Sequence, residues 1–315
     1  MKGKRIWSGL LALVFCLGLL PATALAAAEG SEKHTDHTEW TALTEDVLKE
    51  KEYQLEDGQY YFSGTEYEYG ELVIETSSVL TVTGNVTLCL NNVSYTYTGN
   101  NESAVVVEEN ASLTICCCQP GQYSDYAGSI HAPNAKYVIN NGGTLRITGG
   151  EVYSNVEYGA PVYNAGACTV SGGNLYGNAG NPLGGYKTAY GIYNADEASL
   201  TITGAPTIEG KAPGEMDDPT GPQIDVLTYD TICVEDLSDD FWGFNIGFYG
   251  EAGTTVVSGV TGDPDDWTGT WYLFTLAYPE NAVFTYNQPM DGNPGTLVYE
   301  GSSSMAFAGA PMIDG

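Results

Sequence analysis

Short stretches in which apolar and polar residues alternate, each ending in a glycine-rich turn, recur along the chain from about residue 60 onward. Such alternation is typical of a β-strand with one buried face, because successive side chains point to opposite sides of a strand. The same region shows no convincing 3.6-residue apolar period, which an amphipathic helix would require. The clearest segments span residues 78–84, 111–115, 143–150, 167–173 and 198–204. The pattern predicts an all-β chain built from repeated units.

The repeats are spaced like the coils of a solenoid. Five strand residues serve as equivalent anchors, with steps of 33, 32, 23 and 32 residues between them: Leu80, Leu113, Leu145, Cys168 and Leu200. Periods of about 20–50 residues are typical of solenoids, propellers and arrays. A second strand follows each turn, with three residues placed eight positions after their anchors: Tyr153, Tyr176 and Ile208. A third strand precedes the anchors at residues 138–140, 162–164 and 192–194.

Three short strands per coil predict a right-handed parallel β-helix with a triangular coil. Coils stacked about 4.8 Å apart align equivalent residues in columns, and stability becomes a sum over neighbouring coils. We therefore expect the five anchors to form one interior column. Alternation places Leu145, Ile147 and Val152 inside, whereas Thr144, Arg146 and Tyr153 face water.

Turn residues sharpen this prediction. The glycine pairs at 149–150 and 172–173 allow a sharp turn where a Cβ would clash, and we expect Asn140, Asn164 and Asn194 to form a hydrogen-bonded ladder. Propellers and sandwiches are the rival all-β folds, but they are built from hairpins with tight two-residue turns, which this chain does not show.

The remaining segments define the organisation of the chain. Residues 29–58 are expected to form an N-terminal lead and cap, with a brief helix over 44–51, and the β-helix is expected over 59–212, with Tyr60 to Phe62 as its first strand. Long loops are expected to leave one corner at 119–136 and 179–190, where a solenoid usually carries its binding function. Residues 213–300 are assigned to irregular further coils, with a small β domain as the alternative, and 301–315 to a loose tail.

The first 28 residues have the order of a secretory signal peptide. A basic segment, residues 2–5, precedes an apolar stretch over 6–20, and Pro21 and a run of small residues follow. The apolar stretch is shorter than the roughly 20 residues that a membrane-spanning helix needs. We expect cleavage after Ala26 or Ala28, a secreted or cell-surface location, and no membrane span after cleavage. An uncleaved anchor is the alternative.

The charge balance is strongly acidic. The chain has 40 Asp and Glu against 10 Lys and Arg, and three of the basic residues belong to the leader, which leaves a formal charge of about −33. Nucleic-acid binding relies on Lys and Arg to displace counterions, so nucleic acid is excluded as a partner. The same acidity suits a soluble extracellular surface and invites divalent cations.

Six cysteines follow the leader: Cys89, Cys116, Cys117, Cys118, Cys168 and Cys233. The consecutive run 116–118 cannot point to one side of a strand, so it suits neither a Cys-x-x-Cys zinc site nor a simple disulfide ladder. We interpret Cys89 and Cys168 as small core residues on which Cys117 or its neighbours stack. A disulfide remains open, since sequence alone does not assign one in an exported protein.

Several segments carry motifs beyond the strand pattern: Asn85–Asn92, Ser112–Cys116, Gly173–Asn178, and His34, His37 and Trp40 ahead of the first coil. They resemble segments of a widespread group of exported β-helix proteins of Gram-positive gut bacteria. The first is similar to that group's Val-Thr-Leu-Cys-Leu-Asn-Gly-like strand, the second to its Leu-Thr-Leu-Cys-Asp strand and the third to its Gly-Gly-x-Ile-x-Gly-Asn repeat. The resemblance covers most of residues 34–210 and more weakly 224–290. It implies a pectin-lyase-like fold but no particular activity, because fold does not determine function. Many members carry sortase signals or further repeat domains, neither of which we recognise in this sequence, so wall attachment is left open.

A polysaccharide lyase or glycoside hydrolase is the alternative to a binding function. A lyase needs a base beside a uronate, and the one arginine after the leader, Arg146, is expected to point outward from mid-strand as a solvated side chain. A hydrolase needs carboxylates held together. Three acidic pairs are present, all expected in turns: Asp217–Asp218, Asp239–Asp240 and Asp265–Asp266. His34 and His37 lie ahead of the coils and His131 in a loop, so we expect neither catalysis nor metal binding from them.

Outward tyrosines motivate a binding function. Tyr153 and Tyr176 are expected on the same outer face of adjacent coils, and Tyr163 and Tyr193 in a second row. Aromatic rings at the coil spacing can stack on sugar rings, although an aromatic ladder that only stabilises the sheet is the alternative. We expect a non-catalytic scaffold that binds glycans or host-surface components. No cofactor is expected, with structural calcium at Asp263, Asp265 and Asp266 as an open alternative.

Overall fold

The structure, a computed structural model, describes residues 37–66, 72–118, 128–178, 180–181, 185–212, 214–215, 218–219, 223–238, 244–250 and 253–260, and the short segments 274–276, 284–287, 295–299 and 305–307. The predicted leader and His34 lie outside these residues. The described part consists mainly of β-strands and has a single six-residue helix. Within it, no helix is long and apolar enough to cross a membrane.

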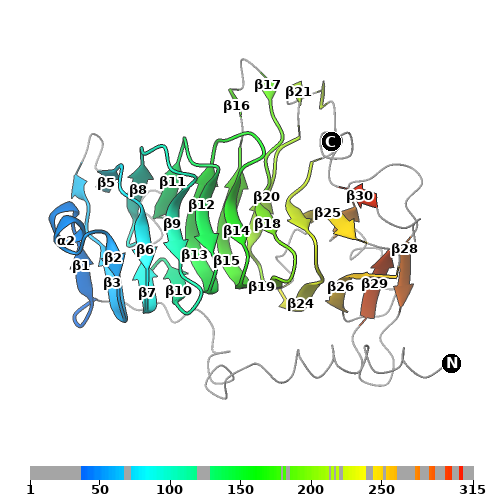
Figure 1. Ribbon diagram of the computed structural model, residues 1–315, viewed down its shortest axis with the longest axis horizontal. Coiled ribbons are helices and arrows are strands. Elements are labelled where there is room, and N and C mark those ends of the chain that lie inside the picture. The colour runs from blue at the N-terminus through cyan, green and yellow to red at the C-terminus, as the bar shows by residue number, and fades with distance from the viewer. Residues whose placement is uncertain are drawn as a thin grey trace. The chain divides into compact units, whose positions relative to one another are not determined.

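Two long stacks of parallel strands form two faces of a β-helix (Figure 1). Each strand pairs in parallel with its equivalents in the neighbouring coils. The first face contains β1 (Thr41–Leu43), β3 (Gly58–Phe62), β7 (Asn85–Cys89), β10 (Ser112–Cys116), β13 (Thr144–Ser154), β15 (Ala167–Gly177), β19 (Ser199–Gly204), β24 (Ile232–Leu237) and β26 (Thr255–Val260). The second contains β2 (Gln54–Leu55), β6 (Leu80–Val82), β9 (Ser103–Val107), β12 (Tyr137–Asn141), β14 (Ala160–Asn164), β18 (Ile192–Asn194), β23 (Val226–Thr228), β25 (Phe244–Gly250) and β27 (Phe274–Leu276).

A third face is joined to the first at a corner. β13 and β15 each run for 11 residues around this corner. The third face contains β5 (Leu72–Thr76), β8 (Val93–Tyr97), β11 (Ser129–Ala132), the second halves of β13 and β15, and β20 (Thr207–Glu209). Gly173 turns the corner at φ +82°, and a Cβ there would lie 2.6 Å from the carbonyl oxygen of Gly150. The predicted coil of three parallel-stacked strands is confirmed.

The interior is filled by columns of apolar residues. One column holds four of the predicted anchors, each at most 2% exposed: Leu113, Leu145, Cys168 and Leu200. The prediction for Leu80 is wrong, because it lies on β6 of the second face in register with Val105, and Val86 pairs with Leu113 instead. Both segments alternate in the same way, and alternation alone does not tell which face a strand joins.

A ladder of buried asparagines lies at the end of the second-face strands. Asn141 Nδ2 donates to Asn164 Oδ1 at 2.7 Å, Asn164 Nδ2 donates to Asn194 Oδ1 at 2.7 Å, and Asn194 Nδ2 donates to Thr228 Oγ1 at 3.0 Å. The ladder is as predicted except for its first member, which is Asn141 and not the half-buried Asn140. All three ladder side chains are fully buried, so these bonds satisfy amides that water does not reach.

A short helix closes the amino-terminal end of the stack (Figure 1). The helix α2 (Glu45–Glu50) begins at Thr44, whose Oγ1 accepts from the backbone N–H of Val47 at 3.3 Å, and Leu48 is buried in the core. This is the helix predicted over 44–51. The prediction that Tyr60 to Phe62 is the first strand is wrong, since β1 and β2 precede it and β1 pairs in parallel with β3.

Two segments predicted as loops contain strands. β11 lies within the expected loop 119–136 and belongs to the third face. Within 179–190, two short strands form a small antiparallel sheet with two later ones: β16 (Gly180–Asn181), β17 (Gly185–Tyr186), β21 (Gly214–Glu215) and β22 (Asp218–Pro219). A further short strand, β4 (Thr65–Glu66), pairs antiparallel with β5.

Parallel coils continue past residue 213, through β23 to β27. Three antiparallel strands follow: β28 (Phe284–Asn287), β29 (Gly295–Tyr299) and β30 (Met305–Phe307). β29 pairs with β26 and β30 pairs with β25. Residues 301–315, expected as a loose tail, therefore include a paired strand. Antiparallel partners use hydrogen-bonding groups that a strand edge would otherwise expose.

Candidate functional site

The outer side of the third face carries a row of side chains that we call the Tyr153 row: His131 on β11, Tyr153 on β13, Tyr176 on β15 and Glu209 on β20. Their Cα atoms are register partners across successive strands. The ring centroids of His131 and Tyr153 lie 4.6 Å apart with a 42° tilt, and all four side chains are partly exposed. The predicted alignment of Tyr153 with Tyr176 is confirmed.

Ile208, predicted as the next member of this row, is inside the core instead. It pairs with Leu175 and is 4% exposed. Cys168 and Leu200 are register partners, and so are Leu175 and Ile208. Leu175 lies seven residues after Cys168, whereas Ile208 lies eight residues after Leu200, so the chain before β20 is one residue longer. A one-residue shift moves a side chain to the other side of a strand.

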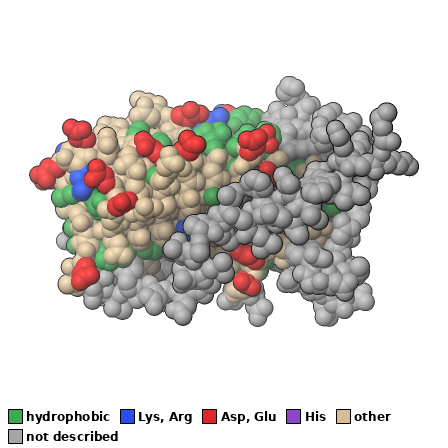
Figure 2. Space-filling view, turned by 60° about the horizontal axis from the view of Figure 1, so that its bottom comes forward, with side chains coloured by type: hydrophobic (Ala, Val, Ile, Leu, Met, Phe, Trp, Pro, Cys, Tyr) green, Lys and Arg blue, Asp and Glu red, His purple; other side chains and the backbone are tan. Residues whose placement is uncertain are grey.

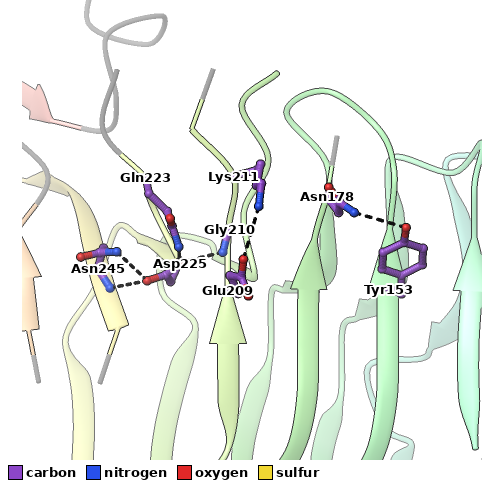
Figure 3. A network of polar contacts seen from close by, with 8 residues as sticks. All are labelled: Tyr153, Asn178, Glu209, Gly210, Lys211, Gln223, Asp225 and Asn245. Carbon is purple, nitrogen blue, oxygen red and sulfur yellow. Dashed lines mark hydrogen bonds and ion pairs between the residues drawn. The ribbon is translucent and has the colours of Figure 1, made fainter. Parts of the chain in front are cut away.

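Polar side chains border the two tyrosines. Glu151 and Asn174 are register partners two residues before Tyr153 and Tyr176 on the same strands, and Asn174 Nδ2 donates to Glu151 Oε1 at 3.1 Å. On the opposite side, Asn178 Nδ2 donates to the Tyr153 hydroxyl at 3.4 Å (Figure 3). Carboxylate and amide groups beside exposed aromatic rings are the groups that a hydroxyl-rich ligand needs for orientation.

Electrostatics at the row disfavour anionic ligands. Partial burial raises the pKa of the Tyr176 hydroxyl, and the carboxylates of Glu151 and Glu209 raise that pKa further. Burial lowers the pKa of His131 below its ordinary value near 6.5, so its imidazole is uncharged at neutral pH. The row thus combines uncharged rings with carboxylates.

A second group of tyrosines, which we call the Tyr163 cluster, lies on the outer side of the second face: Tyr137, Tyr163, Tyr190, Tyr193 and Tyr229. Tyr163 and Tyr193 are register partners with ring centroids 5.2 Å apart, and Tyr137 stacks on Tyr163 at 4.6 Å. The Tyr193 hydroxyl donates to the Tyr229 hydroxyl at 3.2 Å. Tyr137 and Tyr190 are only 6% and 1% exposed. The rings of this cluster pack mainly on one another.

One buried carboxylate, Asp225, lies close to the end of the Tyr153 row (Figure 3). Oδ1 accepts from the Gly210 backbone N–H at 2.7 Å and from Gln223 Nε2 at 2.8 Å, and Oδ2 accepts from the backbone N–H and Nδ2 of Asn245 at 2.6 and 2.9 Å. Burial raises the pKa of the Asp225 carboxyl even so. Because both oxygens are already occupied, this carboxylate joins neighbouring coils and offers nothing to a substrate.

The chain matches no protein-family model, and no curated protein or solved structure is significantly similar to it. Any function therefore has to be argued from the chemistry of its own surface.

Of the arginine and the acidic pairs considered for catalysis, only Arg146 and Asp218 lie in the described residues. Arg146 is half-buried on the first face, in register with Thr114 and Thr169. Asp218 lies at the start of β22, where a turn was expected. The proposed calcium ligands Asp263, Asp265 and Asp266 lie outside the described residues.

The cysteines only partly follow the prediction. None of the six described cysteines forms a disulfide, and Cys168 occupies the interior column as expected. Cys89 is also fully buried, but it follows the inward Leu88 and so lies on the outer side of β7. Cys117 packs against the core.

Sequence reasoning missed two members of the Tyr153 row. His131 was placed in a loop, although the alternation of Ser129, Ile130, His131 and Ala132 is that of a short strand. Glu209 was missed because Ile208 was taken for the outward residue. Ile130 and Ile208 are both buried. Each of these isoleucines marks the inward position of a short strand, so the residue after it, His131 or Glu209, could have been predicted to point outward.

Proposed function

We propose that this protein is an extracellular, non-catalytic scaffold that binds neutral glycans along the Tyr153 row. The observation that carries the proposal is the placement of Tyr153 and Tyr176 as register partners with amide and carboxylate groups beside them. Stacking on a sugar ring uses the apolar face of a tyrosine, and the bordering groups hydrogen-bond sugar hydroxyls.

The charge of the surface supports a neutral rather than a uronate or sulfated glycan. The carboxylates of Glu151 and Glu209 lie close enough to Tyr176 to raise the pKa of its hydroxyl. Figure 2 shows acidic side chains spread over one face of the molecule with few Lys or Arg among them. Anionic sugars would be repelled by such a surface.

An extracellular location is part of the proposal and rests on the order of residues in the first 28 positions. It is tested by recovering the protein from the medium of a Gram-positive host and sequencing its amino terminus. A mature protein that begins after Ala26 or Ala28 supports export, and retention of the intact chain in the cytoplasm overturns it.

The binding proposal is tested on a glycan array followed by calorimetry. Two stacked rings contribute about 3 kcal/mol, so a Tyr153→Ala/Tyr176→Ala variant should bind its best neutral glycan on the order of 100-fold more weakly. The matched control is Tyr163→Ala/Tyr193→Ala, which changes the same residue types in the same kind of register on the second face. Binding equal to wild type in the first variant, or absent in all three proteins, overturns the proposal.

A glycan-cleaving enzyme is the second candidate, because Glu151 and Glu209 both lie near Tyr176 and Lys211 Nζ lies 3.5 Å from Glu209 Oε1. Carboxylates beside a sugar-binding row are the groups that a hydrolase uses. Incubation of the best array ligand with the protein, followed by a reducing-end assay, decides between the two. Release of new ends that is lost in Glu151→Gln and Glu209→Gln would establish the enzyme.

A further inference from the structure

A cluster of sulfur and imidazole ligands lies on the outer side of the first coils. Tyr61, Cys89 and Cys116 are register partners on β3, β7 and β10. The chain then passes Cys117 and places the Cys118 Sγ 3.4 Å from the Cys89 Sγ. The Nε2 of His37, which precedes β1, lies 3.5 Å from the Cys118 Sγ. All three ligand atoms lie within 4.8 Å of one another.

The surroundings hold the imidazole in place. The His37 ring stacks on Tyr61 at a centroid distance of 4.3 Å and an angle of 13°, and it meets Trp40 edge-on at 5.3 Å. The backbone N–H of Trp40 donates to the His37 carbonyl at 3.0 Å, which closes the turn that leads into β1. A ligand clamped between aromatic rings needs little ordering when an ion binds.

The distances fit a tetrahedral metal ion. Bonds of about 2.3 Å from zinc to sulfur and about 2.0 Å to nitrogen put two sulfur ligands about 3.8 Å apart and a sulfur and a nitrogen about 3.5 Å apart. The observed separations of 3.4 Å between Cys89 and Cys118 and 3.5 Å between Cys118 and His37 are close to these values. A disulfide would instead require the two sulfurs to approach to about 2.05 Å.

Ligand chemistry selects the ion. Two thiolates and an imidazole suit a borderline or soft ion such as Zn²⁺, whereas calcium and magnesium require oxygen ligands. We propose that His37, Cys89 and Cys118 bind one zinc ion, which fastens the N-terminal lead to the first coils of the β-helix. On binding, the two thiols release their protons to solvent, and the neutral imidazole donates its Nε2 lone pair. The fourth position is filled by water or by Cys116, which neighbours Cys89 across the β7–β10 ladder.

The site joins three segments that are distant in the sequence: the lead at residue 37, the end of β7 and the turn after β10. Metal binding to a folded site contributes to the free energy of folding. Zinc should therefore stabilise the amino-terminal coils. The site is separate from the Tyr153 row, and either proposal can fail without the other.

The test uses the full chain, reduced and freed of metal with EDTA, and titrated with Co²⁺ as a spectroscopic probe. We expect one cobalt per chain, a thiolate-to-cobalt charge-transfer band and the visible bands of tetrahedral cobalt, all abolished by one equivalent of Zn²⁺. Cys89→Ala and Cys118→Ala should each weaken the charge-transfer band, because one thiolate ligand is left. Each should bind zinc at least about 100-fold more weakly, the upper end of the loss typical of an outer-shell partner. His37→Ala should lose the tetrahedral bands.

Matched controls are Cys117→Ala, one residue from a ligand but packed against the core, and His131→Ala on the third face. Both should bind cobalt as wild type does. A second measurement needs no variant: zinc should protect Cys118 of the wild-type protein, a thiol that is partly exposed, from iodoacetamide. The proposal is overturned if the reduced wild-type protein takes up no cobalt, if Cys89→Ala binds it unchanged, or if zinc leaves alkylation of Cys118 unaltered.

Discussion

The second and third faces of the β-helix both carry tyrosines in register, but they use the rings differently. On the second face, Tyr163 stacks on Tyr137 and packs at a tilt against Tyr193, and Tyr193 is hydrogen-bonded to Tyr229. On the third face, Tyr153 and Tyr176 are neighboured by His131 and by amide and carboxylate groups. Stacking coils aligns like residues on either face, so register alone makes no binding site. The neighbours decide whether a ring is available to a ligand.

The interior under the two faces also differs. The strands of the second face end in the asparagine ladder, whereas the column inside the third face is apolar: Tyr95 is followed by Ile130, Val152, Leu175 and Ile208. A polar ladder fixes register because each amide has one partner above and one below. The contrast predicts that the second face contributes more to stability and the third more to binding.

The largest effect should come from cutting the ladder. Asn164→Ala removes the acceptor of Asn141 and the donor to Asn194 in a region that water does not reach. We expect the free energy of unfolding to fall by about 3 kcal/mol, measured by urea denaturation. Asn140→Ala, half-buried one residue from the ladder, should change it by less than about 0.5 kcal/mol. Equal losses in the two variants would show that the ladder has no special role.

A stability loss of intermediate size should distinguish the Tyr163 cluster from the Tyr153 row. Tyr163→Ala removes a ring that contacts two others, and we expect the free energy of unfolding to fall by about 2 kcal/mol. Tyr153→Ala should lower it by less than about 1 kcal/mol, because that ring has fewer aromatic neighbours. Together with the glycan measurements, these values test the division of roles. A larger stability loss for Tyr153→Ala than for Tyr163→Ala would contradict it.

The smallest effect is a pH dependence of the third face. Burial lowers the native pKa of His131, so below about pH 6.5 the unfolded chain takes up this proton more readily than the folded one. The contribution of His131 to stability is therefore complete above the unfolded pKa and is lost as the pH falls toward the native pKa. We expect the urea midpoint of the wild type to fall more between about pH 7 and pH 5 than that of His131→Gln.

The other titrating groups, including the carboxyl of Asp225, are the same in the wild type and in His131→Gln. Their contributions to the pH dependence therefore cancel when the two proteins are compared. Among the described residues, Tyr153 packs its ring on His131, Asn155 Nδ2 lies 3.5 Å from the His131 Nε2, and Thr96 is the register partner of His131 on β8. Parallel curves for the two proteins would show that the environment of His131 does not disfavour its charge.

Sequence reasoning was most successful where the repeat was most regular. From Leu113 to Leu200 the anchors, the glycine corners and the Tyr153–Tyr176 register follow the prediction, because each coil repeats the same alternation. The errors at Asn140 and Ile208 are displacements by one residue, which move a side chain to the other side of its strand. The error at Leu80 is a choice between two strands with similar alternation, and Leu80 is still inside the coil.

The sulfur and imidazole cluster illustrates what spacing does not reveal. His37, Cys89 and Cys118 are separated by 52 and 29 residues, and no local metal-binding spacing joins them. Only the stacking of β3, β7 and β10 and the path of the chain after Cys116 bring their ligand atoms within 4.8 Å.

The sequence by itself determined the all-β parallel coil, its three strands and its inward apolar columns, because these follow from a side-chain alternation that is local. The tertiary structure decided which columns are continuous, which tyrosines have stacking partners, and where thiols and imidazole meet. Those features depend on the exact length of each turn and on contacts between distant coils, and neither is encoded in the period of any single strand.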